Sequence, residues 1–479
     1  MAKSGKVWLV GAGPGAMGLI TQRGKEALLQ AHVVLYDRLV NPGILLGTRP
    51  KTLFVDAGKT PREKRMEQNE IHRLLIGFAK KGLNVVRLKG GDPYVFGRGG
   101  EEAEALVRAG VSFEVVPGVT AGIAAPAYAG IPVTHRGIST EAVFRIGSRA
   151  EGTVSGKTLV GYMSVDGLDQ FLAHATELGF TKRTPASLIE RGTTTKQRVI
   201  IGTVGTLAKK ANKLMVQAPA VIVVGEVVSL CNRCTPKTKK PLLGKRVILT
   251  VSENLGKEWR RVFEEQGAEV WEIPMTRIEA LPVQKTWRAR VLKSDWLIFT
   301  SAAAVRAFPS VAGDLRSISH CKIAAVGKST AQVLGSIGLV PDWVGPGPGS
   351  KELLSGWSKK AQGKILHLTG NAGNGDLVKG FRKMGFSAER LVIYRNNAGE
   401  EVPDPVLRIL RTEGADWVVF ASGTAAERFR KIISRWSTEP KVIAIGPGTA
   451  RSAKHVGWKV CAVAKEPSSD SVLRGILKS

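Results

Sequence analysis

A glycine-rich loop near the N-terminus could hold a ligand against the backbone. Gly11 and Gly13 follow the apolar run Val7–Val10, and Asp37 ends the next apolar run. This Gly-x-Gly-x-x-Ala pattern is shared by dinucleotide sites, where the acid binds a ribose hydroxyl. Pro14 argues against a dinucleotide, because proline has no N–H group for a pyrophosphate and its ring restricts the backbone where a helix should begin. The loop therefore indicates a ligand site but does not favour NAD.

Later strands are followed by further turns that combine glycine with charged or hydroxyl residues. Asp37 and Asp92 each end a buried strand in a glycine-flanked turn, which is where open α/β sheets bind ligands. The segments of this kind are Arg87–Pro93, Gly97–Glu102, Pro117–Ala121 and Gly130–Arg136.

The elements that must position these turns are strands alternating with helices. Apolar runs at Lys6–Val10, Val33–Tyr36, Val85–Leu88 and Phe113–Val116 alternate with helical patterns at Glu67–Lys81 and Gly100–Ala109. This alternation predicts a largely parallel α/β sheet. Further strands are expected at Thr158–Met163, Ala186–Ile189, Gln197–Gly202 and Ala220–Val224. The polar, basic segment Cys231–Pro241 is expected to be a linker.

The second half contains an internal repeat. Asp295–Ser301 is echoed by Asp416–Ser422, and Lys322–Gly327 by Lys441–Gly446. A repeat of about 120 residues is a duplicated domain rather than a solenoid unit. We expect two similar lobes with a ligand cleft between them. Hydroxyl residues recur at equivalent places in both lobes, and Thr330 and Thr449 could either bind substrate or cap helices.

Composition restricts the class of protein. The 479 residues are 43% hydrophobic, enough for several globular cores, and no apolar run reaches the roughly 18 residues of a membrane helix. Four cysteines make no disulfide framework, which fits a reducing cytoplasm. The single Cys231-x-x-Cys234 pair is not expected to bind metal.

The chain is strongly basic, with a net charge of +30. Such a surface attracts polyanions, including nucleic acids. Neither zinc-finger spacing nor an RNA-binding aromatic motif nor a long basic arm accompanies the charge, so specific nucleic-acid binding is not expected. A substrate with many carboxylates would account for the charge equally well.

The motifs of the first half, in their order and spacing, resemble uroporphyrinogen-III C-methyltransferases over roughly residues 5–230. The resemblance implies a two-lobed tetrapyrrole methylase fold, usually a homodimer, that binds S-adenosylmethionine between its lobes. The reaction adds two methyl groups to uroporphyrinogen III and gives precorrin-2. The cofactor-binding residues of the family fall on Pro14, Gly90, Gly91, Asp92, Val95, Thr120, Ala121, Met163 and Gly192.

The resemblance also suggests catalytic roles. Asp37 matches the proposed base of the family and Lys59 its proposed proton donor. Arg98 and Arg136 are candidates for binding substrate carboxylates, because a guanidinium group matches a carboxylate in shape and charge. His135 is expected to be structural rather than catalytic.

Residues 242–479 resemble uroporphyrinogen-III synthases, which close hydroxymethylbilane into a macrocycle while inverting its last ring. Tyr394 matches a tyrosine suspected of helping hydroxide to leave. Ser301, Thr330, Ser422 and Thr449 are candidates for binding the substrate. In this family the second lobe is inserted into the first, with crossings expected near Ala280–Pro282 and Asn396–Pro403.

Three positions depart from the two families. Ala16 stands where the methyltransferases usually carry an acid, and Ile146–Arg149 replaces a Thr-Gly-His segment. Val251 replaces an arginine that is common after the first strand of the synthases. Two alternatives therefore stay open: a catalytically weakened binding protein, and a methylase-fold relative that acts on another precorrin or on RNA.

The predicted architecture is α/β throughout, a two-lobed tetrapyrrole methylase fold followed by a bilobal duplicated α/β synthase fold. The expected domains are a methyltransferase at 1–230, a linker at 231–241 and a synthase at 242–479. S-adenosylmethionine is the expected cofactor and no metal is expected. The expected partners are small-molecule tetrapyrroles and a second copy of the chain, in the cytoplasm. Whether the product goes to siroheme or cobalamin is left open.

Overall fold

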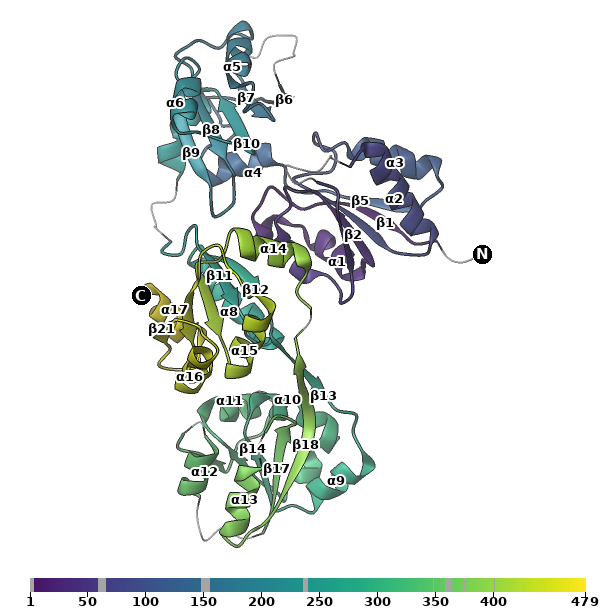
Figure 1. Cartoon of the computed structure of the whole chain (residues 1–479), viewed down its shortest axis with the longest axis vertical. Coiled ribbons are helices and arrows are strands. Elements are labelled where there is room, and N and C mark those ends of the chain that lie inside the picture. Colours follow the sequence, from purple (N-terminus) through teal and green to yellow (C-terminus); the bar gives the residue numbers. More distant parts are fainter. Residues whose placement is uncertain are drawn as a thin grey trace. The chain divides into compact units, whose positions relative to one another are not determined.

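The computed structural model describes residues 4–58, 66–147, 156–235, 240–347, 349–357, 363–373, 375–399 and 401–479. The chain divides into two compact units, one formed by residues 1–273 and 401–479 and the other by residues 274–400 (Figure 1). The boundaries fall near the two chain crossings predicted from the sequence. Among the described residues, no helix is long and apolar enough to cross a membrane.

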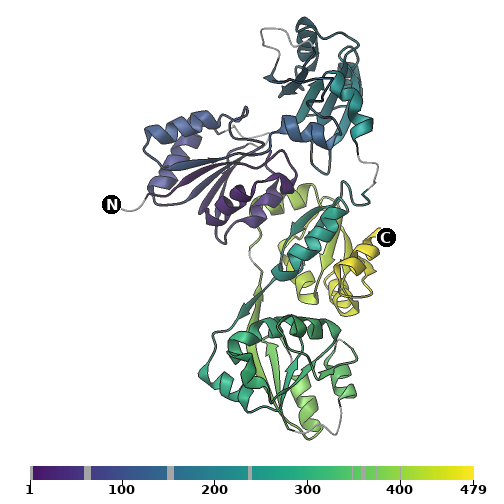
Figure 2. The ribbon, with the colours of Figure 1, turned by 180° about the vertical axis from the view of Figure 1, so that it is seen from behind.

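The first sheet is parallel throughout and carries the N-terminal glycine loop. Its order is β3-β2-β4-β1-β5, and its strands are β1 (Val7–Gly11), β2 (Val33–Tyr36), β3 (Leu53–Asp56), β4 (Val85–Lys89) and β5 (Phe113–Val116). Helices α2 (Gln68–Lys80) and α3 (Gly99–Arg108) cover one face, and α1 (Gln22–Gln30) lies on the other (Figure 2). Because both faces are covered, β1 and β2 are continuous apolar runs, whereas the central strand β4 also contains Arg87 and Lys89.

The second sheet is mainly antiparallel, in contrast to the parallel first sheet; the sequence predicted strands in this part of the chain but not their pairing direction. Its order is β6-β7-β10-β8-β9, and only β6 and β7 pair in parallel. The strands are β6 (Ala142–Ile146), β7 (Thr158–Tyr162), β8 (Pro185–Glu190), β9 (Arg198–Thr203) and β10 (Ala220–Val224). The loop between β8 and β9 is too short for the crossover that a parallel pair needs, so these strands form a hairpin.

Four helices and a 3-10 segment accompany the second sheet. They are α4 (Ala121–Tyr128), α5 (Leu168–Glu177), α6 (Leu207–Lys213), the 3-10 segment η3 (Glu226–Leu230) and α7 (Cys231–Cys234). The predicted linker is therefore helical over its first four residues. Cys231 is buried and its Sγ donates to the carbonyl of Ala129 at 3.0 Å, which fixes α7 to the end of α4.

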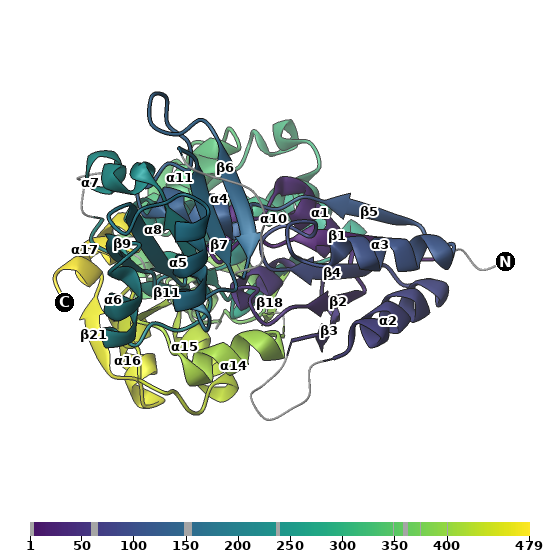
Figure 3. The ribbon, with the colours of Figure 1, turned by 90° about the horizontal axis from the view of Figure 1, so that it is seen from above.

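The third sheet belongs to the same unit and is parallel, in the order β12-β11-β19-β20-β21. Its strands are β11 (Arg246–Leu249), β12 (Glu269–Glu272), β19 (Trp417–Phe420), β20 (Lys441–Ala444) and β21 (Val460–Val463). Its helices are α8 (Glu253–Glu265), α14 (Asp404–Thr412), α15 (Gly423–Ile432), α16 (Pro447–His455) and α17 (Ser469–Leu477). Figure 3 gives a view from above in which β11, β21 and the five helices are labelled. We call this part the outer lobe.

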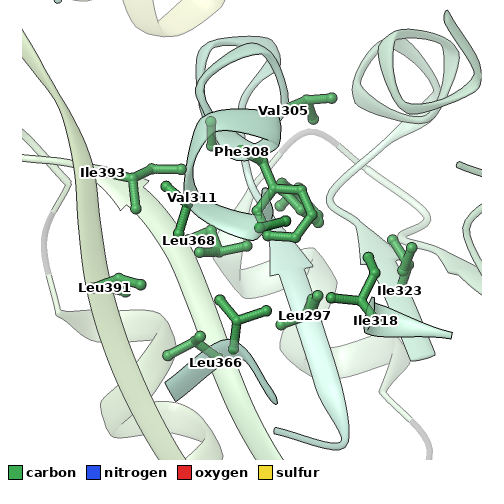
Figure 4. Packing of buried hydrophobic residues seen from close by; sticks show 14 of the residues in the cluster. Leu297, Val305, Phe308, Val311, Ile318, Ile323, Leu366, Leu368, Leu391 and Ile393 are labelled. Atoms are coloured by element: carbon green, nitrogen blue, oxygen red, sulfur yellow. The ribbon is translucent and has the colours of Figure 1, made fainter. Parts of the chain in front are cut away.

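The second unit, which we call the inner lobe, is built on the sheet β13-β18-β17-β14-β15-β16. Its strands are β13 (Thr276–Ala280), β14 (Trp296–Phe299), β15 (Lys322–Ala325), β16 (Trp343–Val344), β17 (Lys364–Gly370) and β18 (Ser387–Ala398). Its helices are α9 (Lys285–Leu292), α10 (Ala302–Ala312), α11 (Lys328–Ser336), α12 (Ser350–Gly356) and α13 (Asp376–Lys383). Phe308 of α10 packs onto Leu297, Leu366 and Leu368 of the sheet (Figure 4).

The repeat found in the sequence corresponds to a shared sheet order. Strands β11-β19-β20-β21 of the outer lobe follow the same order as β17-β14-β15-β16 of the inner lobe. The repeated segments Asp416–Ser422 and Asp295–Ser301 contain β19 and β14, and each leads into a helix, α15 and α10 respectively. The two lobes thus place equivalent serines at equivalent strand ends.

Candidate functional site

Three glycine turns meet at the carboxyl ends of β1, β4 and β5. The N–H groups of Gly13 and Gly91 each donate to the other's carbonyl, at 3.2 and 2.8 Å. A Cβ added to Gly11 would lie 2.5 Å from Cα of Gly118 and 2.6 Å from the carbonyl oxygen of Gly91. Only glycine permits this approach, because any side chain would force the three backbones apart. The turns predicted to bind a ligand are therefore adjacent.

Asp92 holds two of these segments in position. Its carboxylate accepts from the N–H of Gly118 at 2.9 Å and from that of Tyr94 at 2.8 Å. The predicted cofactor residue Gly91 has φ of 69°, and a Cβ there would project to within 3.8 Å of the backbone of Thr120 and Ala121. The space beside Gly91 thus faces the first residues of α4, and a ligand can approach the backbone from this side.

Tyr162, at the end of β7, joins the second lobe of the methylase half to this site. Its hydroxyl accepts from the N–H of Gly122 at 2.7 Å and lies 2.8 Å from Oγ1 of Thr120. Burial raises the pKa of Tyr162, so the phenol stays neutral at physiological pH. Met163 follows with φ of 52° and is largely exposed, which leaves its side chain free to contact a ligand.

The first glycine loop is supported by the turn after β8. The N–H of Ala16 donates to Oγ1 of Thr193 at 3.0 Å. A Cβ on Gly15 would lie 2.6 Å from Cγ2 of Thr194, and one on Gly192 would clash with Ala125 of α4. The structure therefore places Gly192 against α4 and brings its neighbour Thr193 to the first loop. Two predicted cofactor residues, Pro14 of this loop and Val95, are partly buried.

Asp37 is held by a buried charged network. Nη2 of Arg87 donates to Asp37, and Nε of Arg87 donates to Oε1 of Glu102 at 3.0 Å. Nζ of Lys89 donates to the same Oε1 at 2.9 Å. Burial alone would lower the pKa of Arg87, but the carboxylates of Asp37 and Glu102 offset this effect and raise it. The carboxylate of Asp37 remains about one-third exposed, so it can reach a substrate.

Arg98 lies at the start of α3, the helix that carries Glu102. It is the residue before α3, and it forms an exposed ion pair with Glu101 at 2.7 Å. Both line a hollow of about 360 Å³ together with Met66, Glu67, Gln68 and Asn69. Arg136 is exposed in the loop before β6, where His135 Nδ1 lies 2.8 Å from its carbonyl oxygen. Lys59, the predicted proton donor, falls outside the described residues.

In the inner lobe, two polar pairs lie at the end of β14. The hydroxyl of Ser301 lies 3.1 Å from that of Tyr394, the predicted catalytic residue. Oγ1 of Thr300 lies 2.9 Å from Nε2 of His367, which is 3% exposed. Burial, together with the charge of Arg390, lowers the pKa of His367 to about 4, so the imidazole is neutral at pH 7.

Helix capping, one of the two roles left open for Thr330 and Thr449, is not what the structure shows. Gly327 and Gly446 are the N-cap residues of α11 and α16 and make no side-chain cap. Instead the serines cap: Ser301 accepts from the N–H of Ala304 and Ser422 from that of Ala425, both at 3.1 Å. Thr330 is buried in the first turn of α11, whereas Thr449 in the first turn of α16 is partly exposed.

The departures from the two families fall in different environments. Val251 is 1% exposed and packs in the core of the outer lobe, so its side chain contributes to folding rather than to ligand contact. Ala16 lies in the first loop and uses only its backbone N–H. Ile146 is exposed at the end of β6, and residues 148 and 149 of its segment lie outside the described residues.

Sequence reasoning missed several partners of the predicted residues. Thr193, His367 and Thr300 were not singled out, although all three make polar side-chain contacts. Arg87 and Glu102 appeared only as members of motifs. The buried position of Arg87 could have been suspected, because Arg87 interrupts an otherwise apolar strand and must find a carboxylate.

The chain is similar to known proteins in both halves. It matches the family of tetrapyrrole (corrin/porphyrin) methylases over residues 6–208 and that of the uroporphyrinogen-III synthase HemD over residues 257–474. The porphyrin biosynthesis protein HemD of Ruminiclostridium josui is 32% identical over 495 residues, which cover 99% of this chain and 98% of that protein.

Single-function relatives match the first half alone. The uroporphyrinogen-III C-methyltransferase of Priestia megaterium is 47% identical over 235 residues, covering 47% of this chain and 99% of that protein. A crystal structure of the uroporphyrin-III-C-methyltransferase from Thermus thermophilus is 41% identical, covers 49% of this chain and 98% of that one, and has a TM-score of 0.42.

Proposed function

Because this chain belongs to the family of the porphyrin biosynthesis protein HemD and joins a tetrapyrrole methylase to a uroporphyrinogen-III synthase, we propose that it carries out two consecutive reactions. The synthase half converts hydroxymethylbilane to uroporphyrinogen III. The methyltransferase half then methylates this product twice, giving precorrin-2.

The observation that carries the methyltransferase proposal is the meeting of the glycine turns beside Asp37. S-adenosylmethionine, when bound, would supply a methyl group on a sulfonium, which a carbon nucleophile can accept while S-adenosylhomocysteine leaves as the neutral thioether. Backbone of Gly90 and Gly91, the first turn of α4 at Thr120 and Ala121, and Met163 would hold this cofactor. The absence of a side chain at Gly91 supports this assignment, since the cofactor could approach the backbone there without meeting a Cβ atom.

The chain's own contribution to methyl transfer is alignment and proton removal. Methylation of a pyrrole carbon leaves a cationic macrocycle that must lose a proton, and Asp37 is the proposed base. Arg98 and Arg136 would bind carboxylates of the macrocycle, and the net charge of +30 suits a substrate with eight of them. Lys59 is proposed as a proton donor.

In the synthase half, Tyr394 is proposed to donate a proton to the departing hydroxyl group of hydroxymethylbilane. The carbon–oxygen bond breaks and water leaves. The resulting cation is attacked by the substituted carbon of the last ring, which gives a spiro intermediate; the other bond of that ring then breaks, and the ring is attacked again in the inverted orientation. The proton lost when the macrocycle closes can return to the Tyr394 phenolate. The hydroxyl of Ser301, 3.1 Å away, supports this role because it can orient the phenol. Ser422, Thr330 and Thr449 are proposed to bind substrate carboxylates.

We also propose that the chain acts in the cytoplasm as a homodimer joined through its methyltransferase half. Large apolar side chains that face solvent in this half, such as Ile123, Val199 and Met215, support a partner surface. Small-molecule tetrapyrroles are its proposed substrates, without a specific nucleic-acid partner. Light scattering after gel filtration tests the dimer: a monomer at micromolar concentration would contradict it.

The decisive experiment supplies hydroxymethylbilane and methyl-labelled S-adenosylmethionine in one vessel, and separates the tetrapyrroles by chromatography. Doubly labelled precorrin-2 is the expected product. Uroporphyrinogen III without label would leave only the synthase activity and turn attention to Ala16 and the Ile146–Arg149 segment. Exclusive formation of the type I isomer would contradict the synthase assignment.

A further inference from the structure

The buried carboxylate of Glu102 is the centre of the network that ends at Asp37. Its side chain is fully buried, and its Oε1 accepts three hydrogen bonds, from Arg87, Lys89 and Gln68, at 3.0, 2.9 and 3.3 Å. These donors come from β4 and from the first turn of α2, so Glu102 joins α3 to both elements. A carboxylate is stable in such a position only when cations compensate its charge.

Arg87 connects Glu102 to Asp37. Its guanidinium group is 3% exposed and donates from Nε to Glu102 and from Nη2 to Asp37. The planar group therefore has two of its edges occupied by carboxylates and little freedom to rotate. Two cations, Arg87 and Lys89, face two carboxylates, Asp37 and Glu102, so the four groups are together neutral.

The four members differ in exposure in an informative way. Arg87, Lys89 and Glu102 are at most 3% exposed, whereas the side chain of Asp37 is 31% exposed. Here the network presents a single carboxylate to the site, and the same first turn of α3 also carries Arg98 and Glu101 at the hollow.

We propose that Glu102 is a positioning residue for methyl transfer: it fixes Arg87, and Arg87 fixes the carboxylate of Asp37 toward the substrate. The inference rests on the proposed role of Asp37 as the base. Glu102 itself touches neither substrate nor cofactor. Lys89 supplies a second positive charge beside Glu102, so that Arg87 remains available to Asp37.

The test is Glu102→Gln in the full chain, assayed with uroporphyrinogen III and S-adenosylmethionine under anaerobic conditions. Glutamine keeps the size of the side chain and an oxygen that can accept from Arg87, but it removes the charge, so Arg87 loses its ion pair with Glu102 and is held less firmly. We expect kcat for methyl transfer to fall at least tenfold, with KM for S-adenosylmethionine changed less than twofold. The synthase half reports on folding, and its rate should be unchanged.

The pH profile separates positioning from general loss of structure. Without the charge of Glu102, Arg87 and Lys89 have only Asp37 as a counter-ion, so Asp37 is harder to protonate. The acid limb of the kcat profile should therefore move to lower pH, by about half a unit to one unit. His72, on α2, also faces Glu102. Burial lowers the pKa of His72 and the charge of Glu102 opposes this shift, so the pKa of His72 should fall further in the variant.

Glu104→Gln is the matched control, because Glu104 lies on the same helix and is 72% exposed in a pair with Arg108. It should leave kcat and the pH profile unchanged. The inference is overturned if Glu102→Gln keeps the wild-type kcat, or loses activity with an unmoved acid limb. If the wild type itself transfers no methyl group, the proposed function fails and the positioning role fails with it.

A double variant keeps the test valid if Glu102→Gln does not fold. Glu102→Gln combined with Lys89→Met removes one charge of each sign, so the remaining Arg87–Asp37 pair is neutral. This variant should fold, and its kcat should still be at least tenfold lower than that of the wild type, because Arg87 still lacks its ion pair with Glu102. The acid limb should move less than in the single variant. Recovery of wild-type kcat would overturn the inference.

Discussion

The two catalytic halves position their candidate catalytic residues by different means. In the methyltransferase half, Asp37 is held by Arg87 within a buried network of full charges. In the inner lobe of the synthase half, Tyr394 pairs with the hydroxyl of Ser301, and Thr300 pairs with His367, whose imidazole is kept neutral by burial. Charges act over longer distances than neutral hydrogen bonds. The effect of a substitution should therefore reach more distant groups in the first half than in the second.

The two lobes of the synthase half show the same contrast on a smaller scale. By the repeat, Thr300 and His367 of the inner lobe correspond to Ala421 and Ile248 of the outer lobe. The shared fold thus carries a buried polar pair in one lobe and apolar residues in the other. A buried polar pair adds little stability over apolar packing, so its presence in one lobe only points to a role other than folding.

The largest effect is expected from Asp37→Asn. Loss of a general base lowers kcat by two to four orders of magnitude, so methyl transfer should fall at least about 100-fold. Formation of uroporphyrinogen III by the same chain should not change, because Asp37 lies in the other half. Asp169→Asn, an exposed acid at the start of α5, is the control. Label incorporation and synthase rate measure the two activities, and equal losses in both would contradict the separation of the halves.

His367→Gln should change how the stability of the inner lobe depends on pH. The folded pKa of His367 is about 4, below its ordinary value of 6.5. As pH falls from 6.5 toward 4, the unfolded lobe binds a proton that the folded lobe does not, so stability decreases. At pH 5 this loss is about 2 kcal/mol relative to pH 7, and glutamine, which cannot titrate, removes it.

Native-state hydrogen exchange in β14 and β17, compared at pH 5 and pH 7, measures this difference. Because the chain has several domains, local opening is a better observable than a single unfolding transition. The outer-lobe strands β11 and β19 provide the internal control, since Ile248 stands where the inner lobe has His367. An equal pH response in wild type and variant would show that the imidazole titrates normally.

Tyr394→Phe should lower the rate of uroporphyrinogen III formation about tenfold, because the leaving hydroxide loses its proton donor while water can partly replace it. Methylation of supplied uroporphyrinogen III by the same chain should stay unchanged. The ratio of type III to type I product, separated by chromatography, measures the effect against spontaneous closure. A wild-type rate would remove Tyr394 from the mechanism and leave substrate binding as the function of its partner Ser301.

Sequence reasoning predicted some of these features better than others, for physical reasons. Strands β1, β2, β4 and β5 of the first sheet were predicted because they are largely apolar. Strand β3 was not predicted; it lies at the edge of the sheet and is only partly buried. Pairing direction in the second sheet was not, since a single strand does not encode its partner. Glu102 could not be distinguished from Glu101 by sequence: acids in a first helical turn usually interact with the helix dipole in solvent, and only the fold buries one of them.

The smallest effect concerns the equivalent serines, and it can separate capping from substrate binding. Ser422 caps α15, so Ser422→Ala should lower outer-lobe stability by about 1 kcal/mol, whereas Ser422→Gly should cost only a few tenths. If the hydroxyl also binds substrate, both variants raise KM for hydroxymethylbilane by the same factor. Ser468, which caps α17 by accepting from Ser471 at 3.3 Å, gives the control: Ser468→Ala should match the stability loss without changing KM. If KM rises in step with the stability loss across Ser422→Ala, Ser422→Gly and Ser468→Ala, Ser422 only caps the helix. If KM rises by the same factor in both Ser422 variants and not in Ser468→Ala, the hydroxyl of Ser422 contacts the substrate.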